Sequence, residues 1–439
     1  MRFALLVLVA GAIVFALTRL LYSGTALPPA IDTLKLAYGP KSYDAALKLA
    51  DNAVVLGTER VTARPQDWIN QESYARALLG RARLTSSFDD LQEAVTALAK
   101  AKALAGPRDG PLLTDAVANF TVHRLTPIVP DLDALAGFAV PAEPADRAEA
   151  AALRGDVDFY SGRYDAALKH YRAAAGIVDG PGAAFRLALL ELKTGHPEAA
   201  RAEFERSARV NKGRTRQFMA NVWLQLGVVE LSRGRWDDAE ALFGKANVVF
   251  PGNWLVEAHL AQMAALRGQT GEAARRYQAI IARIAQPDVI DALAVLYRNA
   301  GNRAASTAWA ARSAAIWNRR LAQLPEAAYA HALEHELVLG DPRKALALAR
   351  QNMHARPYGD SATMLAWALI ANAQPAAAVR ILDALNRTRW QTAQQYVALS
   401  QAQAMLGNSA ASDTARDAAL KLNPRAFDPA ASLIWFGNH

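Results

Sequence analysis

The sequence of 439 residues contains no cysteine, and this absence excludes several kinds of site. Without a thiol the chain forms no disulfide framework, no thiolate zinc site and no cysteine nucleophile, and it has no cysteine to carry a lipid anchor. Charged residues are also scarce, at 21%, against 52% hydrophobic residues. This composition is typical of a folded chain and excludes an intrinsically disordered one.

A strong excess of one charge is missing as well. The 49 lysine and arginine residues against 41 aspartate and glutamate residues give a net charge of +8, which is spread along the chain. No basic run with interleaved stacking aromatics matches a nucleic-acid-binding motif, so we expect no nucleic-acid partner. The densest basic stretch, residues 201–216, is interpreted as a solvated helix end, because cations there meet the negative end of the helix dipole. An acidic partner or lipid headgroups are the alternative.

Long hydrophobic runs are absent except at the N-terminus. Phe3–Leu17 gives fifteen apolar positions without a charge. Counting through Arg19 to Tyr22 extends the run to the roughly 20 residues of a spanning helix, whereas the shorter run fits the core of a signal peptide. We therefore expect residues 1–26 to be a membrane anchor or a cleaved signal peptide, with membrane contact through residues 3–22. A buried helix of a cytosolic fold is the third alternative.

The charges that flank this run predict its orientation. Arg2 and the free amino group outweigh Arg19, so the positive-inside rule places the N-terminus in the cytoplasm and the rest of the chain outside it. We expect an inner-membrane protein with its body in the periplasm, or a protein exported after signal cleavage.

Short turns recur along the remaining chain at a nearly fixed spacing. Successive turn positions are 33, 39, 34, 33, 39, 33 and 34 residues apart. A period of this size is typical of a solenoid. An apolar helical pattern precedes each turn and a second one follows it, which predicts a helix-turn-helix unit. The turn positions are Gly162, Gly195, Gly234, Gly268, Gly301, Gly340, Ala373 and Gly407.

The unit from Ala220 to Pro251 resembles the tetratricopeptide repeat family. Its large, small and apolar residues have the spacing of that family's repeat. The resemblance implies an all-α fold, a right-handed α-solenoid of stacked helix-turn-helix repeats that follows the N-terminal hydrophobic segment. The residues that carry the resemblance are Trp223, Leu226, Gly227, Gly234, Trp236, Ala239, Phe243, Ala246 and Pro251.

The same frame predicts the organisation of the chain. Eight repeats resembling the family are readable over residues 148–424, followed by a C-terminal tail at 425–439. Residues 29–140 have a looser register and are interpreted as degenerate N-terminal helical repeats. Prolines between 127 and 144 mark the one subdomain boundary that we expect, and we interpret it as a bend in a single superhelix.

Two of the intervals are 39 residues long, which exceeds the others by more than a helical turn. The extra residues lie near Lys212–Arg216 and near Asn318–Gln323, where longer second helices are expected. Such extensions would splay the superhelix or form a protruding basic docking edge. The residues assigned to this edge are Arg214, Arg216, Arg319 and Arg320.

One string has the spacing of a catalytic motif. His331, Glu334 and His335 form H-x-x-E-H, in which two histidines on one helix face bind zinc in some metalloproteases. Catalytic zinc needs a third protein ligand, and no glutamate follows Glu336. We therefore expect exposed helix-face histidines, no metal, no cofactor and no enzymatic activity, and we keep a zinc hydrolase as the remote alternative.

The resemblance also implies that the first helix of each pair lines an inner groove. Positions carried over from the family are apolar in the earlier repeats and polar in the later ones, where His259, Gln262, Asp291, Arg298 and Asn299 occur. An apolar groove suits an amphipathic helix or an extended hydrophobic peptide. Packing between neighbouring first helices is the equally weighted alternative. The apolar groove residues are Phe159, Tyr160, Phe185, Leu189, Leu192, Leu224, Val228 and Leu231.

Together these features predict a non-enzymatic interaction scaffold of a bacterial-type cell envelope, with a protein or peptide partner from a secretion, pilus or polysaccharide assembly. The type of assembly is an analogy from the fold class. An exported module that binds a peptide or glycan outside a standing complex is the alternative.

Overall fold

The computed structural model describes residues 30–106 and 109–436, and these ranges contain helices and no strands. The predicted anchor or signal peptide at residues 1–26 lies outside the described residues. Among the helices that are described, none is both long and apolar enough to cross a membrane. The chain divides into two units, residues 1–36 and residues 37–439. The described part of the first holds the short 3-10 helix η1 (Ile31–Thr33).

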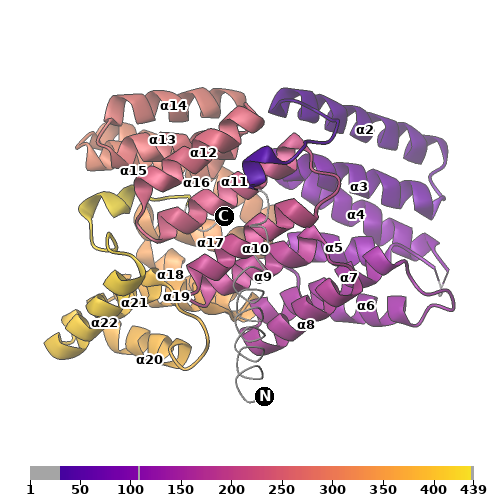
Figure 1. Cartoon of the computed structure of the whole chain (residues 1–439). Coiled ribbons are helices and arrows are strands. Elements are labelled where there is room, and N and C mark those ends of the chain that lie inside the picture. The colour runs from indigo at the N-terminus through magenta and orange to yellow at the C-terminus, as the bar shows by residue number, and fades with distance from the viewer. Residues whose placement is uncertain (1–29, 107–108, 437–439) are drawn as a thin grey trace, which may run out of the picture. The chain divides into compact units, whose positions relative to one another are not determined.

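The second unit is an array of α-helices, which confirms the predicted all-α class (Figure 1). Its described residues form twenty-one α-helices and the 3-10 helix η2 near the C-terminus. In chain order they are α2 (Tyr43–Ala63), α3 (Trp68–Thr85), α4 (Phe88–Leu104), α5 (Leu112–Thr121), α6 (Ile128–Ala136), α7 (Pro144–Tyr160), α8 (Tyr164–Ile177), α9 (Pro181–Lys193), α10 (Pro197–Val210), α11 (Arg216–Ser232), α12 (Trp236–Val249), α13 (Trp254–Leu266), α14 (Thr270–Arg283), α15 (Pro287–Asn299), α16 (Arg303–Gln323), α17 (Pro325–Val338), α18 (Pro342–Ala355), α19 (Gly359–Ala371), α20 (Pro375–Leu385), α21 (Ala393–Met405), α22 (Ser409–Leu422) and η2 (Pro429–Leu433).

From α3 onward, consecutive helices pack as pairs, and α2 packs against α3 before the first pair. First helices of successive pairs also touch, as α5 touches α7 and α17 touches α19. Each pair therefore buries its apolar face against its neighbours, which is the packing of a solenoid. Helices α7 to α22 form eight such pairs, in the part of the chain where eight repeats are predicted.

The turns inside the pairs follow one local pattern. At seven of the eight predicted turn positions the backbone has a positive φ, between 55° and 82°. The residue after each of these positions donates its N–H to a carbonyl five residues earlier, as Arg163 does to Asp158 over 2.8 Å, and this bond closes the helix end. The exception is Gly340, whose N–H donates to the carbonyl of Glu336 as in a continuing helix.

Ala373 is the one non-glycine residue at these left-handed turn positions, with a φ of 55°. Since a side chain makes this conformation costly, Ala373→Gly is expected to raise the free energy of unfolding by about 0.5–1 kcal/mol, after allowance for the more flexible unfolded chain. Urea unfolding measures the change. The control is Ala347→Gly at an exposed position within α18, which should lower stability instead, because glycine weakens a helix interior. If both variants changed the free energy of unfolding by the same amount and in the same direction, the backbone at Ala373 would not be strained.

Close helix crossings within pairs use the predicted small residues. A Cβ atom placed on Gly227 of α11 would lie 2.4 Å from Cε1 of Phe243 on α12. Ala239 is fully buried in the same crossing. The pair α7–α8 repeats the arrangement, since a Cβ atom on Gly155 would lie 2.5 Å from Cε1 of Tyr171. The small residues of the family spacing therefore lie where the two helices of a pair approach each other most closely.

The two long intervals have different causes, and one prediction about them was wrong. Residues 318–323 do extend a second helix, because α16 runs for 21 residues to Gln323. Residues 212–215 instead form a loop between α10 and α11. The loop arises because Arg214 Nη1 donates to the carbonyls of Ala208, Arg209 and Asn211, which ends α10, while Thr215 caps the start of α11.

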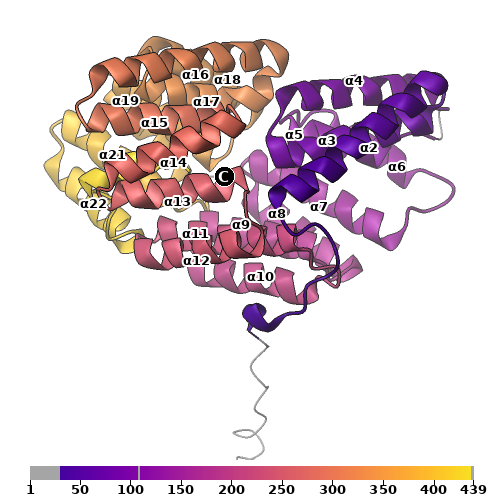
Figure 2. The same ribbon diagram turned by 90° about the horizontal axis from the view of Figure 1, so that it is seen from above.

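Segments about 200 residues apart also contact each other within the second unit. Helix α4 touches α16 (Figure 2). Tyr164 Oη accepts the N–H of Gly359 at 2.9 Å, and Lys193 Nζ lies 2.8 Å from Asp360 Oδ2. The Gln391 N–H donates to the Lys193 carbonyl at 2.9 Å. These contacts bring residues of early and late repeats together.

Candidate partner-binding surfaces

Two of the predicted groove residues lie inside a cluster of aromatic rings. Phe159 on α7 is 2% exposed, and its ring centroid lies 6.0 Å from that of Trp390 and 6.1 Å from that of Tyr358. Half-buried Tyr160 packs edge-to-face on Tyr358 at 4.8 Å. Trp390 is fully buried. Residues from later repeats therefore cover this part of the inner face.

The other predicted groove residues divide into two sets. Three on α11 are 2–4% exposed, and three on α9 are half-buried. Phe185 of the second set packs edge-to-face on Phe204, with ring centroids 5.1 Å apart. Partner binding at these residues stays a prediction, and it concerns mainly the half-buried set. The α11 residues are Leu224, Val228 and Leu231, and the α9 residues are Phe185, Leu189 and Leu192.

The four arginines of the predicted basic edge have different environments. Arg214 caps α10 with three hydrogen bonds to carbonyls. Arg320 is 8% exposed, and its guanidinium lies 4.5 Å from the ring centroid of Phe88. Arg216 is half-buried at the start of α11, and Arg319 is exposed on α16. A docking edge at these positions stays a prediction, and Arg320 is too buried to contribute to it.

The H-x-x-E-H string lies on α17, where both histidines pair with aspartates of α15. His331 Nδ1 lies 3.0 Å from Asp288 Oδ1, and His335 Nδ1 lies 2.8 Å from Asp291 Oδ1. Burial lowers the pKa of His335, but the hydrogen bond and charge of Asp291 outweigh burial and raise it above its ordinary value. The expectation of two exposed histidines is therefore wrong for His335, which is 3% exposed.

Asp291 is the centre of this buried network. Its carboxylate accepts hydrogen bonds from Ser313 Oγ and from Trp317 Nε1, the latter at 2.8 Å, in addition to the contact with His335. Burial raises the pKa of Glu334 to about 8. In the part of the chain that the structure describes, no group of three or more potential ligands is arranged to hold a metal ion. The network connects α15, α16 and α17.

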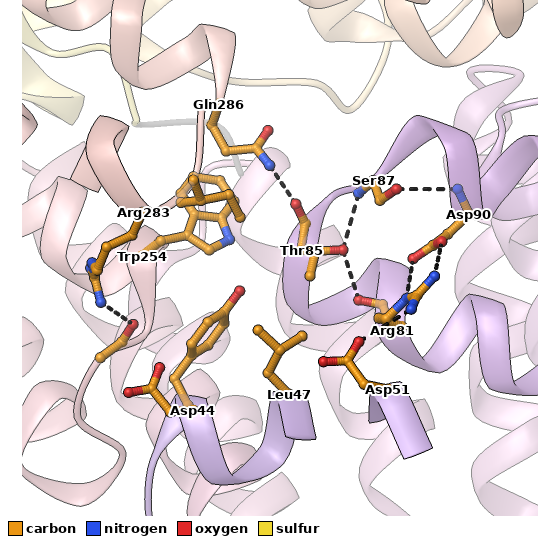
Figure 3. A pocket seen from close by; sticks show the side chains of 13 residues that line it. Asp44, Leu47, Asp51, Arg81, Thr85, Ser87, Asp90, Trp254, Arg283 and Gln286 are labelled. Carbon is orange, nitrogen blue, oxygen red and sulfur yellow. Dashed lines mark hydrogen bonds and ion pairs between the residues drawn. The ribbon is translucent and has the colours of Figure 1, made fainter. Parts of the chain in front are cut away.

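A cavity of about 690 Å³ lies between helices α2 to α4 and the segments that precede α13 and α15 (Figure 3). Side chains from different parts of its lining converge on the C-terminal end of α3. Tyr43 Oη and Trp254 Nε1 both donate to the carbonyl of Leu84, over 3.2 and 3.0 Å, and Gln286 Nε2 donates to that of Thr85. Because the last carbonyls of a helix lack partners within it, these side chains satisfy them from another part of the chain.

The charged groups in this cavity mostly pair with one another. Arg81 Nη1 lies 3.2 Å from Asp51 Oδ1, and its Nη2 lies 2.6 Å from Asp90 Oδ1 (Figure 3). Arg283 forms an ion pair with Glu257. The hydrogen bond to Asp90 is the main reason that the pKa of Arg81 lies above its ordinary value. These pairs hold the walls of the cavity together.

A second cavity, of about 610 Å³, lies between the α5–α6 connection and helices α17 and α18. Arg124 and Glu326 in its lining form an ion pair at 3.4 Å, and Arg350 is exposed beside them. Burial and the charge of Arg356 keep the pKa of His123 well below its ordinary value. Two arginines against one carboxylate make this lining weakly cationic.

The C-terminal segment lies along the inner helices of the later repeats. Helix η2 contacts α13 and α15, and Asn299 Nδ2 donates to Ser432 Oγ at 3.0 Å. The N–H groups of Trp435 and Phe436 both donate to Gln262 Oε1, over 2.7 and 2.8 Å. Gln262 and Asn299 are among the polar groove positions carried over from the family. The face of α13 and α15 that the family resemblance assigns to the inner groove is therefore covered by a segment of this chain.

Sequence reasoning did not identify the residues of this segment that occupy the groove. Trp435 is 6% exposed and Phe436 is fully buried, although both follow the last predicted repeat. The available signal was the apolar run of residues 433–436, which belongs to no helical pattern and ends in two adjacent aromatic residues. Large apolar side chains in a short tail indicate that the tail packs against the body.

Comparison with known families is consistent with this architecture. The family model described as tetratricopeptide repeat matches residues 152–211 and 185–253. The matched residues extend from α7 to the end of α12. This helical-repeat chain thus carries tetratricopeptide repeats in that part, as the sequence pattern predicts. Comparison with curated proteins gives no match.

Several solved structures are similar to this chain at low identity. Yeast Tom70 is 14% identical over 88% of this chain and 92% of its own, with a TM-score of 0.37. A Rap protein complexed with competence and sporulation factor is 12% identical over 86% of this chain and 93% of its own, with a TM-score of 0.45. A tetratricopeptide repeat protein from Parabacteroides merdae ATCC 43184 is 12% identical over 59% and 99%, with a TM-score of 0.35.

Proposed function

We propose that this protein is a non-enzymatic scaffold that presents the groove of its helical repeats to a protein or peptide partner. The observation that carries the proposal is the C-terminal segment, which contacts α13 and α15 and donates two main-chain hydrogen bonds to Gln262 on α13. A surface that binds a main chain in this way suits peptide recognition, because the same bonds form with many sequences.

The proposal places this scaffold in the cell envelope, with a partner from a secretion, pilus or polysaccharide assembly. Support for this location comes from the apolar run at residues 3–17, which fits an anchor or a signal peptide. Cell fractionation tests it. Recovery of the full-length chain only in the cytosolic fraction would exclude the envelope.

Photocrosslinking in the native cell tests the scaffold function. A photoreactive residue at Asn299, at the edge of the groove, should capture a partner protein that mass spectrometry then identifies. The control position is Val248, which is 80% exposed on α12, the second helix of its pair. The same adducts at both positions, or none at Asn299, would contradict a partner in the groove.

A further inference from the structure

The segment that ends at Phe436 lies against α13 and is bound there through its main chain. Ile434 has an extended conformation, with φ −79° and ψ 103°. The next two N–H groups point to one acceptor, Gln262 Oε1 on α13. Both bonds are donated by main-chain N–H groups of the bound segment, so they do not depend on its side chains.

Side-chain recognition comes from a pocket that the repeats themselves form. The Phe436 ring lies 5.7 Å from that of His259 on α13 and 6.4 Å from that of Tyr277 on α14, measured between centroids. His259 in turn stacks on Phe243 of α12 at 4.4 Å. The pocket walls therefore come from three consecutive helices, and the bound segment supplies only the ring that fills the pocket.

The fit of this segment to the groove is incomplete. Trp435 Nε1 and Gln262 Nε2 are both buried, and neither has a hydrogen-bond partner among the described residues. A buried donor without an acceptor costs free energy. A bound segment that placed an oxygen atom near Gln262 Nε2 would therefore fit this site better than the chain's own residues do.

We propose that the surface around Gln262 is a peptide site that residues 434–436 occupy in cis, and that a partner segment with two adjacent aromatic residues displaces them. This inference rests on the proposed function, because it names the partner class for the same groove. Tethering favours the occupied state, since a short connection to α22 keeps the chain's own segment at a high effective concentration. The partner's segment binds to the site only when it outcompetes the chain's own tethered segment.

Binding of a labelled peptide to two full-length chains tests the proposal. The probe is a fluorescein-labelled peptide of residues 425–436, measured by fluorescence anisotropy. The receptor chains are the unsubstituted protein and the double variant Trp435→Ala, Phe436→Ala, which keeps its whole backbone but loses both rings. We expect the double variant to bind the peptide about 10- to 100-fold more tightly, because the unsubstituted tail competes at an effective concentration in the millimolar range.

Two controls define the site. A probe with both aromatic residues replaced by alanine should not bind the double variant. Adding Gln262→Ala to the double variant should weaken binding of the original probe at least 10-fold while its thermal melt stays cooperative. Binding that is unaffected by Gln262→Ala would place the probe elsewhere and overturn the proposal.

The remaining outcomes are also decisive. If the double variant is folded and does not bind the probe, or if it fails to fold, the aromatic pair belongs to the core and the proposal is wrong. A concentration-dependent dimer of the unsubstituted chain that the double variant loses would assign the groove to the tail of a second copy. The scaffold function is tested separately, because a partner crosslinked at Asn299 would support it even if the peptide did not bind.

Discussion

Asp291→Ala is expected to lower the free energy of unfolding by about 3–5 kcal/mol, the range for removing one partner of a buried ion pair. Asp291 is fully buried, and its carboxylate accepts from Ser313 and Trp317 and lies 2.8 Å from His335 Nδ1. Without the carboxylate, Trp317 Nε1 loses its acceptor while it stays buried, and His335 loses the charge that favours its protonated form, whereas Ser313 Oγ keeps the carbonyl of Ala310.

Urea unfolding followed by circular dichroism measures this loss. The matched control is Asp237→Ala, which removes a carboxylate that is 88% exposed and paired with Arg267. Exposed pairs contribute little, so the control should unfold within experimental error of the parent chain. An Asp291→Ala midpoint as close to the parent as that of the control would mean that α15 and α17 do not pack as described.

Gly227→Leu is expected to destabilise the α11–α12 pair by about 1–3 kcal/mol or more, because the crossing has no space for a side chain. A Cβ atom there would lie 2.4 Å from Phe243 Cε1 and 2.6 Å from its Cδ1. Phe243 is fully buried and stacks on His259, with ring centroids 4.4 Å apart, so its ring has no room to retreat.

The same substitution in the facing helix is the control for this prediction. Gly244 lies one residue after Phe243 on α12, and a Cβ atom on it would meet no atom within 4 Å. Gly244→Leu should therefore leave the thermal midpoint unchanged or raise it, because leucine favours a helix more than glycine does. A comparable fall in midpoint for both variants would show that the loss at Gly227 has another cause than the crossing.

The sequence alone determined the local architecture of this protein. Turn positions at a fixed period predicted the helix pairs, and the structure gives Gly162 and Gly234 positive φ values of 73° and 72°. The spacing of Gly227 and Phe243 predicted their close approach. These features follow from sequence because they depend on residues fewer than about 20 positions apart, where helix geometry fixes which side chains meet.

Some local predictions nevertheless failed, for reasons that are also local. Residues 212–215 were assigned to a longer helix from the interval alone, whereas three hydrogen bonds from the Arg214 side chain end α10 before them. The expectation of exposed histidines was wrong for His335, because the aspartate that pairs with it is 44 residues away. The interval and the motif are both visible in the sequence, but the competing hydrogen bonds are not.

Only the tertiary structure decided which surfaces of the repeats are free. Phe159 looked like a groove residue, yet Trp390, more than 200 residues later, packs on it at 6.0 Å between ring centroids. Phe436 looked like part of a tail, yet it is fully buried against His259. The periodic pattern defines a repeat and its neighbours, but a small rotation at each repeat accumulates along the array. The accumulated rotation cannot be predicted from the sequence of a single repeat. It decides which distant segments meet and cover the inner face.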